Sequence, residues 1–194
     1  MTSRAQHLYL AVLQKIKELN SNVHPRILMC DFEQPIRSAF TECFGHDSAV
    51  RGCYFHFTQA VLKKVSKMHL SGIYRQSESV RNSVRKLLVL PLLQPHQIAP
   101  AFESVRMENA DYLDQLYRYF QLQWIERVGT DEISVNGLDD RTNNGMEGIN
   151  AYLLSKIGSK PGFWDFLRRI TSVVRKYDSD LSMHAGGMNI RRLQ

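Results

Sequence analysis

Cysteine is scarce in this chain, and the long apolar runs of a membrane protein are missing. Three cysteines stand among 194 residues, and so small and odd a number argues against a framework of disulfide bonds. No stretch approaches the roughly 20 consecutive apolar residues that a membrane-spanning helix needs. The opening segment carries charges in a helical pattern, so we do not expect a signal peptide. These absences predict a soluble, intracellular protein without a membrane partner.

Acidic residues are outnumbered by basic ones. The chain has 19 Asp and Glu against 25 Lys and Arg, a net charge of +6 and a sequence pI near 9.3. Because basic side chains release counterions from phosphate groups, this balance favours an anionic partner such as DNA, and we expect no small-molecule substrate. Many basic proteins bind no nucleic acid, so composition alone leaves the partner open.

Two strands are predicted in the first third of the chain. Residues 8–19 come first and have apolar side chains at helical spacing. A short apolar run over residues 26–31 then predicts a buried strand that ends in Asp31. The next run, residues 50–56, predicts a second strand, and Thr58 is expected to cap the helix that follows. The apolar face of the first helix consists of Leu8, Val12, Ile16 and Leu19.

The rest of the chain has the pattern of helices. Residues 77–128 hold three apolar stripes of helical period, and two further helices follow a loop rich in Asn and Gly. The stripes consist of Val80, Val84, Leu87 and Leu88, of Ile98, Phe102 and Val105, and of Leu113, Leu116, Tyr117, Phe120, Trp124 and Val128. The next helix has Met146, Ile149, Leu153 and Ile157 on one face. The last helix is expected to bury Phe163, Phe166, Leu167, Ile170 and Val174, with Trp164 as a further core residue.

Together these elements indicate a single α/β domain, residues 1–194, in which much of the sheet is missing. Residues 8–62 hold both strands, residues 63–137 form a large all-helical insertion, and residues 138–178 form the C-terminal helices. Parallel strands are normally buried in larger sheets, so two of them make a poor core. We therefore expect an exposed apolar edge at Leu28 and Met29, and with it a tendency to form homo-oligomers.

Asp31 and Glu147 are the two acids that the sequence context singles out. Asp31 ends a buried strand, where α/β folds place working residues, although an Asp there also caps the following helix well. Glu147 falls three residues after Asn144, a spacing that a capping box with Asn144 as N-cap explains without chemistry. The residues alone leave both interpretations open for each acid.

Cys53 and His56 form a Cys-x-x-His pair, and Cys43 and His46 repeat its spacing. Four such ligands could hold zinc. The six residues between the pairs are too few for a zinc finger, and Cys43 lies on an apolar stripe, where a cysteine usually packs. We therefore do not expect zinc.

Two helices carry basic faces that could follow a DNA backbone. For each helix taken alone, a solvated surface is the simpler explanation. The first face consists of Lys63, Lys64 and Lys67, and the second of Arg168, Arg169 and Arg175.

Several phrases occur in an order that is typical of one family. The strand ILMCDFE precedes GCYFHFTQAV, and LLVLPLL, a segment with YF and WI, and RTNN..EG.N follow in turn. This order resembles the Mutator-like (MULE) transposase domain, including the copies found beside FLYWCH-type zinc fingers in animals. The resemblance covers about residues 8–166.

The resemblance implies a ribonuclease-H-like fold and a catalytic role for two acids. Asp31 matches the second acid of the family's Asp-Asp-Glu triad, and Glu147 matches its final Glu. Both would be metal ligands, for Mg²⁺ or Mn²⁺, in a site where two metals promote in-line displacement at DNA phosphates. The first acid of the triad would lie on a strand before residue 8, and no other acid stands in a strand-like context.

Four further residues would support that site. Cys53 and His56 match the family's Cys-x-x-His signature, and Asn144 and Asn150 stand in the segment that carries Glu147. The basic faces would contact DNA, and the family implies a nuclear location.

We therefore expect a partial ribonuclease-H-like fold: a transposase-derived DNA-binding or DNA-processing fragment that is not catalytic alone. Two alternatives stay open. The sequence could be a truncated record of an active Mutator-like transposase that cleaves and joins DNA strands, or a domesticated nuclear module that binds DNA or protein.

Overall fold

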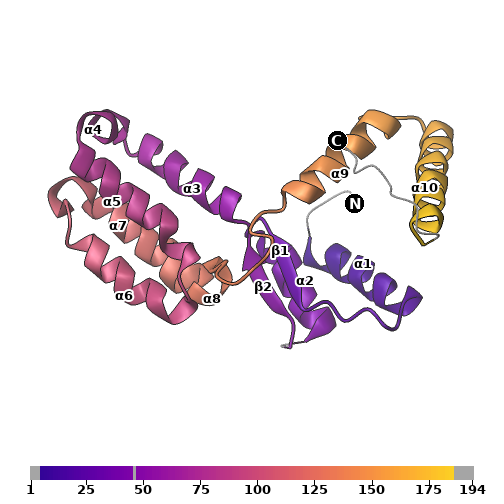
Figure 1. Cartoon of the computed structure of the whole chain (residues 1–194), viewed down its shortest axis with the longest axis horizontal. Helices are drawn as coiled ribbons and strands as arrows, with labels where there is room; N and C mark the ends of the chain where they lie inside the picture. Colours follow the sequence, from indigo (N-terminus) through magenta and orange to yellow (C-terminus); the bar gives the residue numbers. More distant parts are fainter. Residues whose placement is uncertain (1–4, 46, 186–194) are drawn as a thin grey trace. The chain divides into compact units, whose positions relative to one another are not determined.

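Two parallel strands form the sheet in the computed structural model of the protein. β1 (Ile27–Cys30) and β2 (Ala49–Gly52) pair with Cys30 opposite Gly52. The crossover between them is α2 (Gln34–Phe44), because parallel neighbours cannot be joined by a tight hairpin turn. Among the described residues the two predicted strands and the mostly helical α/β composition are confirmed (Figure 1).

The structure describes residues 5–45 and 47–185. The chain divides into two units, residues 1–143 and residues 144–194. The first unit holds the sheet and the helical insertion, and the second holds the last two helices. In the described part no helix is long and apolar enough to cross a membrane.

A small apolar cluster lies between the sheet and its helices. Cys30, Phe40 and Val50 are the buried members, and Leu13 of α1 (Gln6–Leu19) packs against them. The predicted first helix is therefore present and contributes through Leu13.

The interpretation of the apolar face of α1 is wrong. Val12, Ile16 and Leu19 are 47%, 44% and 76% exposed. The physical reason is that α1 packs mainly along α2, so a narrow strip around Leu13 is covered while the rest of the predicted face points to solvent.

Helices follow one another after β2, and they form the predicted insertion. In order they are α3 (Tyr54–Lys67), α4 (Ser71–Gln76), α5 (Glu78–Val89), the 3₁₀ turn η1 (Leu90–Leu92), α6 (Pro95–Arg106), α7 (Ala110–Phe120), the π-helix η2 (Gln121–Val128) and α8 (Thr130–Ile133). The three predicted stripes meet in one large core. Its buried members include Val80, Val84, Leu87, Ile98, Phe102, Val105, Leu113, Leu116, Tyr117, Phe120, Trp124 and Val128.

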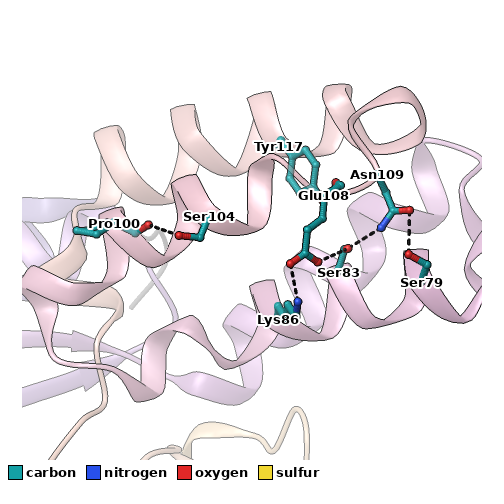
Figure 2. Close-up of polar contacts among 8 residues, drawn as sticks. All are labelled: Ser79, Ser83, Lys86, Pro100, Ser104, Glu108, Asn109 and Tyr117. Carbon is teal, nitrogen blue, oxygen red and sulfur yellow. Dashed lines mark hydrogen bonds and ion pairs between the residues drawn. The ribbon is translucent and has the colours of Figure 1, made fainter.

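Hydrogen bonds hold the turn between α6 and α7 (Figure 2). The Glu108 carboxylate accepts from the Ser83 hydroxyl at 3.1 Å and from Lys86 Nζ at 2.5 Å. The Tyr117 hydroxyl donates to the Glu108 carbonyl at 2.7 Å, and Asn109 Nδ2 donates to Ser83 Oγ at 2.8 Å. Ser83 is buried, so these bonds satisfy a polar group that water cannot reach.

The helical insertion returns to the point where it left the sheet. The backbone N–H of Tyr54 donates to the carbonyl of Arg141 at 2.9 Å. On the way back, the Ser134 hydroxyl donates to the carbonyl of Leu93 at 2.8 Å, which fastens the returning segment to the insertion. We call this backbone contact between Tyr54 and Arg141 the neck.

The second unit consists of α9 (Asn144–Ile157) and α10 (Phe163–Ala185). The rings of Tyr152 and Tyr177 meet edge to face, 6.2 Å apart. Arg169 Nη1 donates to the carbonyl of Ile157 at 3.0 Å and so satisfies one carbonyl at the end of α9.

The expected burial of the last helix is wrong. Phe163, Phe166, Leu167 and Val174 are exposed, and so is Trp164, at 76%. The reason is physical: among the described residues of its unit α10 packs against α9, and one neighbouring helix covers only a narrow stripe.

Candidate functional site

The strand register brings Asp31 and Cys53 together. Cys30 lies opposite Gly52, so the residue that follows each of them leaves the sheet at the same carboxyl edge. The backbone N–H of Cys53 donates to the Cys30 carbonyl at 2.9 Å, which fixes this spacing. Burial raises the pKa of the Cys30 thiol, which therefore stays protonated and belongs to the core.

α3 begins earlier than the sequence predicts. β2 ends at Gly52, and Cys53 is the N-cap of α3 with an extended backbone, φ −64° and ψ 121°. The prediction of a strand through residue 56 is therefore wrong, and so is the expected cap at Thr58. The apolar run continues as a helix because Phe57 packs into the core of the insertion.

This early start places His56 beside Cys53. An N-cap residue and the third residue of a helix face each other across the first turn, as in a capping box. Cys53 is fully buried, while the His56 side chain is 31% exposed. The Cys-x-x-His pair is thus a helix-terminal pair and not the end of a strand.

Four side chains form a connected polar cluster at this edge. His56 Nδ1 lies 3.1 Å from Asp31 Oδ1. Asn143 Nδ2 donates to Asp31 Oδ1 at 2.6 Å, and the Cys53 thiol donates to Asn143 Oδ1 at 3.1 Å. Sequence reasoning found three of the four and missed Asn143, because nothing in the run RTNN distinguishes it from its neighbour Asn144.

Phe32 fixes the backbone beside the cluster. Its φ is +63°, a left-handed conformation that is uncommon outside glycine. This turn lays the ring over Gly52 and against Trp124, with the two ring centroids 5.0 Å apart. Asp31 and Cys53, the chain neighbours of Phe32 and Gly52, are therefore held by a contact that joins the sheet to the helical core.

The cluster has the donor groups of a transition-metal site. One ligand atom from each of Asp31, Cys53 and His56 lies within 4.8 Å of the other two. A thiol and an imidazole are ligands of zinc and its neighbours, whereas Mg²⁺ takes oxygen ligands. The donor set therefore does not fit Mg²⁺ or Mn²⁺, the ions that the resemblance implies.

The other predicted site residues lie in the second unit. Glu147 is in the first turn of α9 and is exposed, as are Asn144 and Asn150. α9 includes Asn144 as its first residue, so a capping box with Asn144 as N-cap does not match its bounds. Asp31, Cys53 and His56, which form the cluster among the described residues, all belong to the first unit.

Cys43, the described member of the second Cys-x-x-His pair, does not join the cluster. Cys43 is half-buried on α2, and its carbonyl accepts from Lys17 Nζ at 3.0 Å. His46 lies outside the described residues. The four-ligand zinc arrangement considered from the sequence therefore gains no support from Cys43.

Basic residues gather around a hollow between α3 and α7. Lys64 Nζ lies 4.7 Å from the ring centroid of Tyr119, and Lys63 and Lys67 are exposed on the same helix. The hollow has a volume of about 590 Å³, and we call it the α3–α7 hollow. It is lined by Lys64, Asp114, Gln115, Arg118, Tyr119, Leu122, Gln123 and Arg127.

The basic residues of α10 are partly engaged within their own unit. Arg168 forms an ion pair with Asp165, and Arg169 binds the end of α9. Arg175 is exposed. The two predicted DNA-binding faces belong to different units. The sequence does not single out Arg118 and Arg127, because they come close to α3 only through the tertiary fold.

Comparisons with protein-family models, with curated proteins and with solved structures found no match to the chain.

Proposed function

We propose that the protein is a transposase-derived domain that binds DNA through the α3–α7 hollow and the lysines beside it. The observation that carries this proposal is the gathering of Lys64, Arg118 and Arg127 around one hollow. Lys63 and Lys67 extend the positive charge along α3. Such a surface matches the phosphate backbone of DNA in the sign of its charge.

The cations and amides of the hollow suit phosphate for different reasons, and they outnumber Asp114, the carboxylate in the lining. Arg118 and Arg127 carry planar guanidinium groups, which bind phosphate oxygens in pairs of hydrogen bonds. Lys64 is held over the Tyr119 ring, so it loses little freedom when it meets a phosphate. The amides of Gln115 and Gln123 can add hydrogen bonds without charge.

Binding of a fluorescent DNA duplex, measured at several salt concentrations, tests the proposal. The double variant Arg118→Gln with Arg127→Gln should weaken binding at least about tenfold and lower the slope of log K against log salt by about 2. The matched control, Lys15→Gln with Arg106→Gln, removes the same charge. Both of its residues pair with a Glu one turn away, and it should keep the wild-type slope. Equal losses in both variants, or binding that ignores salt, would contradict the proposal.

The proposed transposase origin is supported by contacts between side chains of three separate sequence segments. The phrases that carry the resemblance contribute Asp31, then Cys53 and His56, then Asn143, and these side chains form one cluster. We propose on this basis that the two-stranded sheet is part of a ribonuclease-H-like fold. A nuclear location remains a prediction from the resemblance.

We propose DNA binding without cleavage, because the thiol and imidazole beside Asp31 do not fit Mg²⁺ or Mn²⁺. Incubation of supercoiled plasmid with the full chain and either metal should leave the plasmid intact. Nicking that disappears in an Asp31→Asn variant would instead support the alternative of an active Mutator-like transposase.

A further inference from the structure

We infer that Asp31, Cys53 and His56 bind one zinc ion. The inference does not rest on the proposed DNA binding, because it uses only the geometry and chemistry of these three side chains. The sequence offers zinc two Cys-x-x-His pairs as ligands. The structure supplies a carboxylate in place of the second pair.

The spacing of the donor atoms is close to that of a tetrahedral site. With zinc–ligand distances of about 2.0–2.3 Å, neighbouring ligand atoms lie about 3.5 Å apart. His56 Nδ1 and Asp31 Oδ1 are 3.1 Å apart, and all three ligand atoms lie within 4.8 Å of one another. The longest of these separations is therefore at most about 1.3 Å wider than in a tetrahedral zinc site.

The backbone holds the ligands before any metal arrives. Asp31 and Cys53 are set by the paired ends of two strands, and His56 by the first turn of α3. The contact of Phe32 with Gly52 locks the same edge. A preorganised site loses little conformational entropy on binding, which favours affinity.

Asn143 lies beside the proposed ligands and forms hydrogen bonds with two of them. Its Nδ2 donates to Asp31 Oδ1 at 2.6 Å, and such a bond orients a carboxylate that ligates a metal. When zinc binds, the Cys53 thiol gives up its proton to solvent and coordinates as the thiolate. The hydrogen bond from the thiol to Asn143 Oδ1 is lost in that step. Asn143 Nδ2 can then donate hydrogen bonds to both the Asp31 carboxylate and the Cys53 thiolate.

Three protein ligands leave a fourth tetrahedral position. The Asp31 side chain is 49% exposed and that of His56 is 31% exposed, so this position is open to water from their side. Zinc sites with three protein ligands and an open position are of the type that binds a further group, in contrast to closed structural sites.

Metal analysis of the purified full chain tests the inference. After equilibration with zinc and removal of the excess, we expect one zinc per chain. The Cys53→Ser and His56→Gln variants should each lower the affinity at least about tenfold. Cys43→Ser is the matched control, because it removes a cysteine outside the cluster, and it should keep the wild-type stoichiometry.

Cobalt distinguishes ligation from a folding defect. The wild type and Cys43→Ser should show the thiolate-to-cobalt absorption band, and Cys53→Ser should lose it while its circular dichroism stays native. If Cys53→Ser does not fold, His56→Gln should keep the thiolate band but shift the visible bands of the cobalt. Substoichiometric zinc in the wild type, loss of zinc in Cys43→Ser, or displacement of zinc by millimolar Mg²⁺ would overturn the inference.

Discussion

The ring of Phe32 occupies the space above Gly52 that any other residue would need for its side chain. A Cβ atom built on Gly52 would lie 2.0 Å from Phe32 Cε1 and Cζ. Non-bonded carbon atoms do not approach so closely, so residue 52 must be glycine for as long as Phe32 keeps its position. The two residues belong to the segments that supply Asp31 and Cys53, and their contact therefore sets the geometry of the polar cluster.

Gly52→Ala should destabilise the first unit by about 2–3 kcal/mol, because the added methyl group pushes Phe32 off Trp124. Urea unfolding measures the loss. Gly72→Ala is the control: nothing lies near its added methyl group, and α4 should gain about 0.5–1 kcal/mol. The double variant Phe32→Ala with Gly52→Ala should lose less than the sum of the single losses. Strict additivity would show that the contact is absent.

Glu132→Gln should be strongly destabilising. Glu132 forms an ion pair with Arg37, whose side chain is only 10% exposed, and burial lowers the pKa of that guanidinium. Removing the carboxylate leaves a buried charge unpaired, at a cost of about 3 kcal/mol in the free energy of unfolding. Lys15→Gln breaks an exposed pair and should cost less than about 1 kcal/mol. Similar losses in the two variants would contradict the buried pair.

Glu108 should stabilise the folded protein near neutral pH and lose this contribution to the free energy of unfolding in acid. The hydrogen bond from Lys86 and a further one from Ser83 lower the pKa of Glu108. A carboxyl whose folded pKa lies below its unfolded value stabilises the fold above the unfolded pKa, about 4.3, and loses this stabilisation as the pH falls through the folded pKa.

The comparison of wild type with Glu108→Gln at pH 6 and pH 3 measures this contribution. The difference in unfolding free energy between the two proteins should be larger at pH 6 and shrink at pH 3. Its size should stay below about 1 kcal/mol, because the carboxylate is partly exposed to water. A constant difference across this range would show that the carboxylate has no such partners.

The two tryptophans should report opposite environments. Trp124 is 3% exposed and Trp164 is 76% exposed. A Trp164→Phe variant, which keeps Trp124, should emit at shorter wavelength and resist quenching by acrylamide. A Trp124→Phe variant, which keeps Trp164, should emit at longer wavelength and be quenched readily. If Trp164 is quenched as weakly as Trp124, the face of α10 that carries Trp164 is covered in solution.

The sequence predicts the helical insertion well because its stripes are long and regular. Leu113, Leu116, Phe120 and Trp124 repeat at helical spacing, and a pattern of that length excludes a strand. The apolar run over residues 50–56 is too short to distinguish a strand from a helix, because a brief apolar run fits either. The structure divides this run at Cys53.

The last helix shows a different limit. Its pattern identifies which face is apolar, but not whether another element covers that face. Phe163 and Trp164 are exposed because, in the part of the second unit that the structure describes, α9 is the helix that packs against α10.

The candidate site was partly predictable for a related reason. Asp31 ends a strand and Cys53 and His56 share a local motif, so the sequence marks all three. Asn143 is separated from Asp31 by 112 positions. Its role depends on where the insertion returns, which no local pattern encodes.

The neck between Tyr54 and Arg141 has a kinetic consequence. The helices of the insertion form contacts between near neighbours in sequence, and such contacts form quickly. The contact of Cys53 with Asn143 spans 90 positions, and it can form cheaply only after the intervening helices have collapsed and shortened the loop that must close. The hydrogen bonds of Asn143 should therefore be among the last contacts of the first unit to form, after the strand pairing that brings Asp31 and Cys53 together.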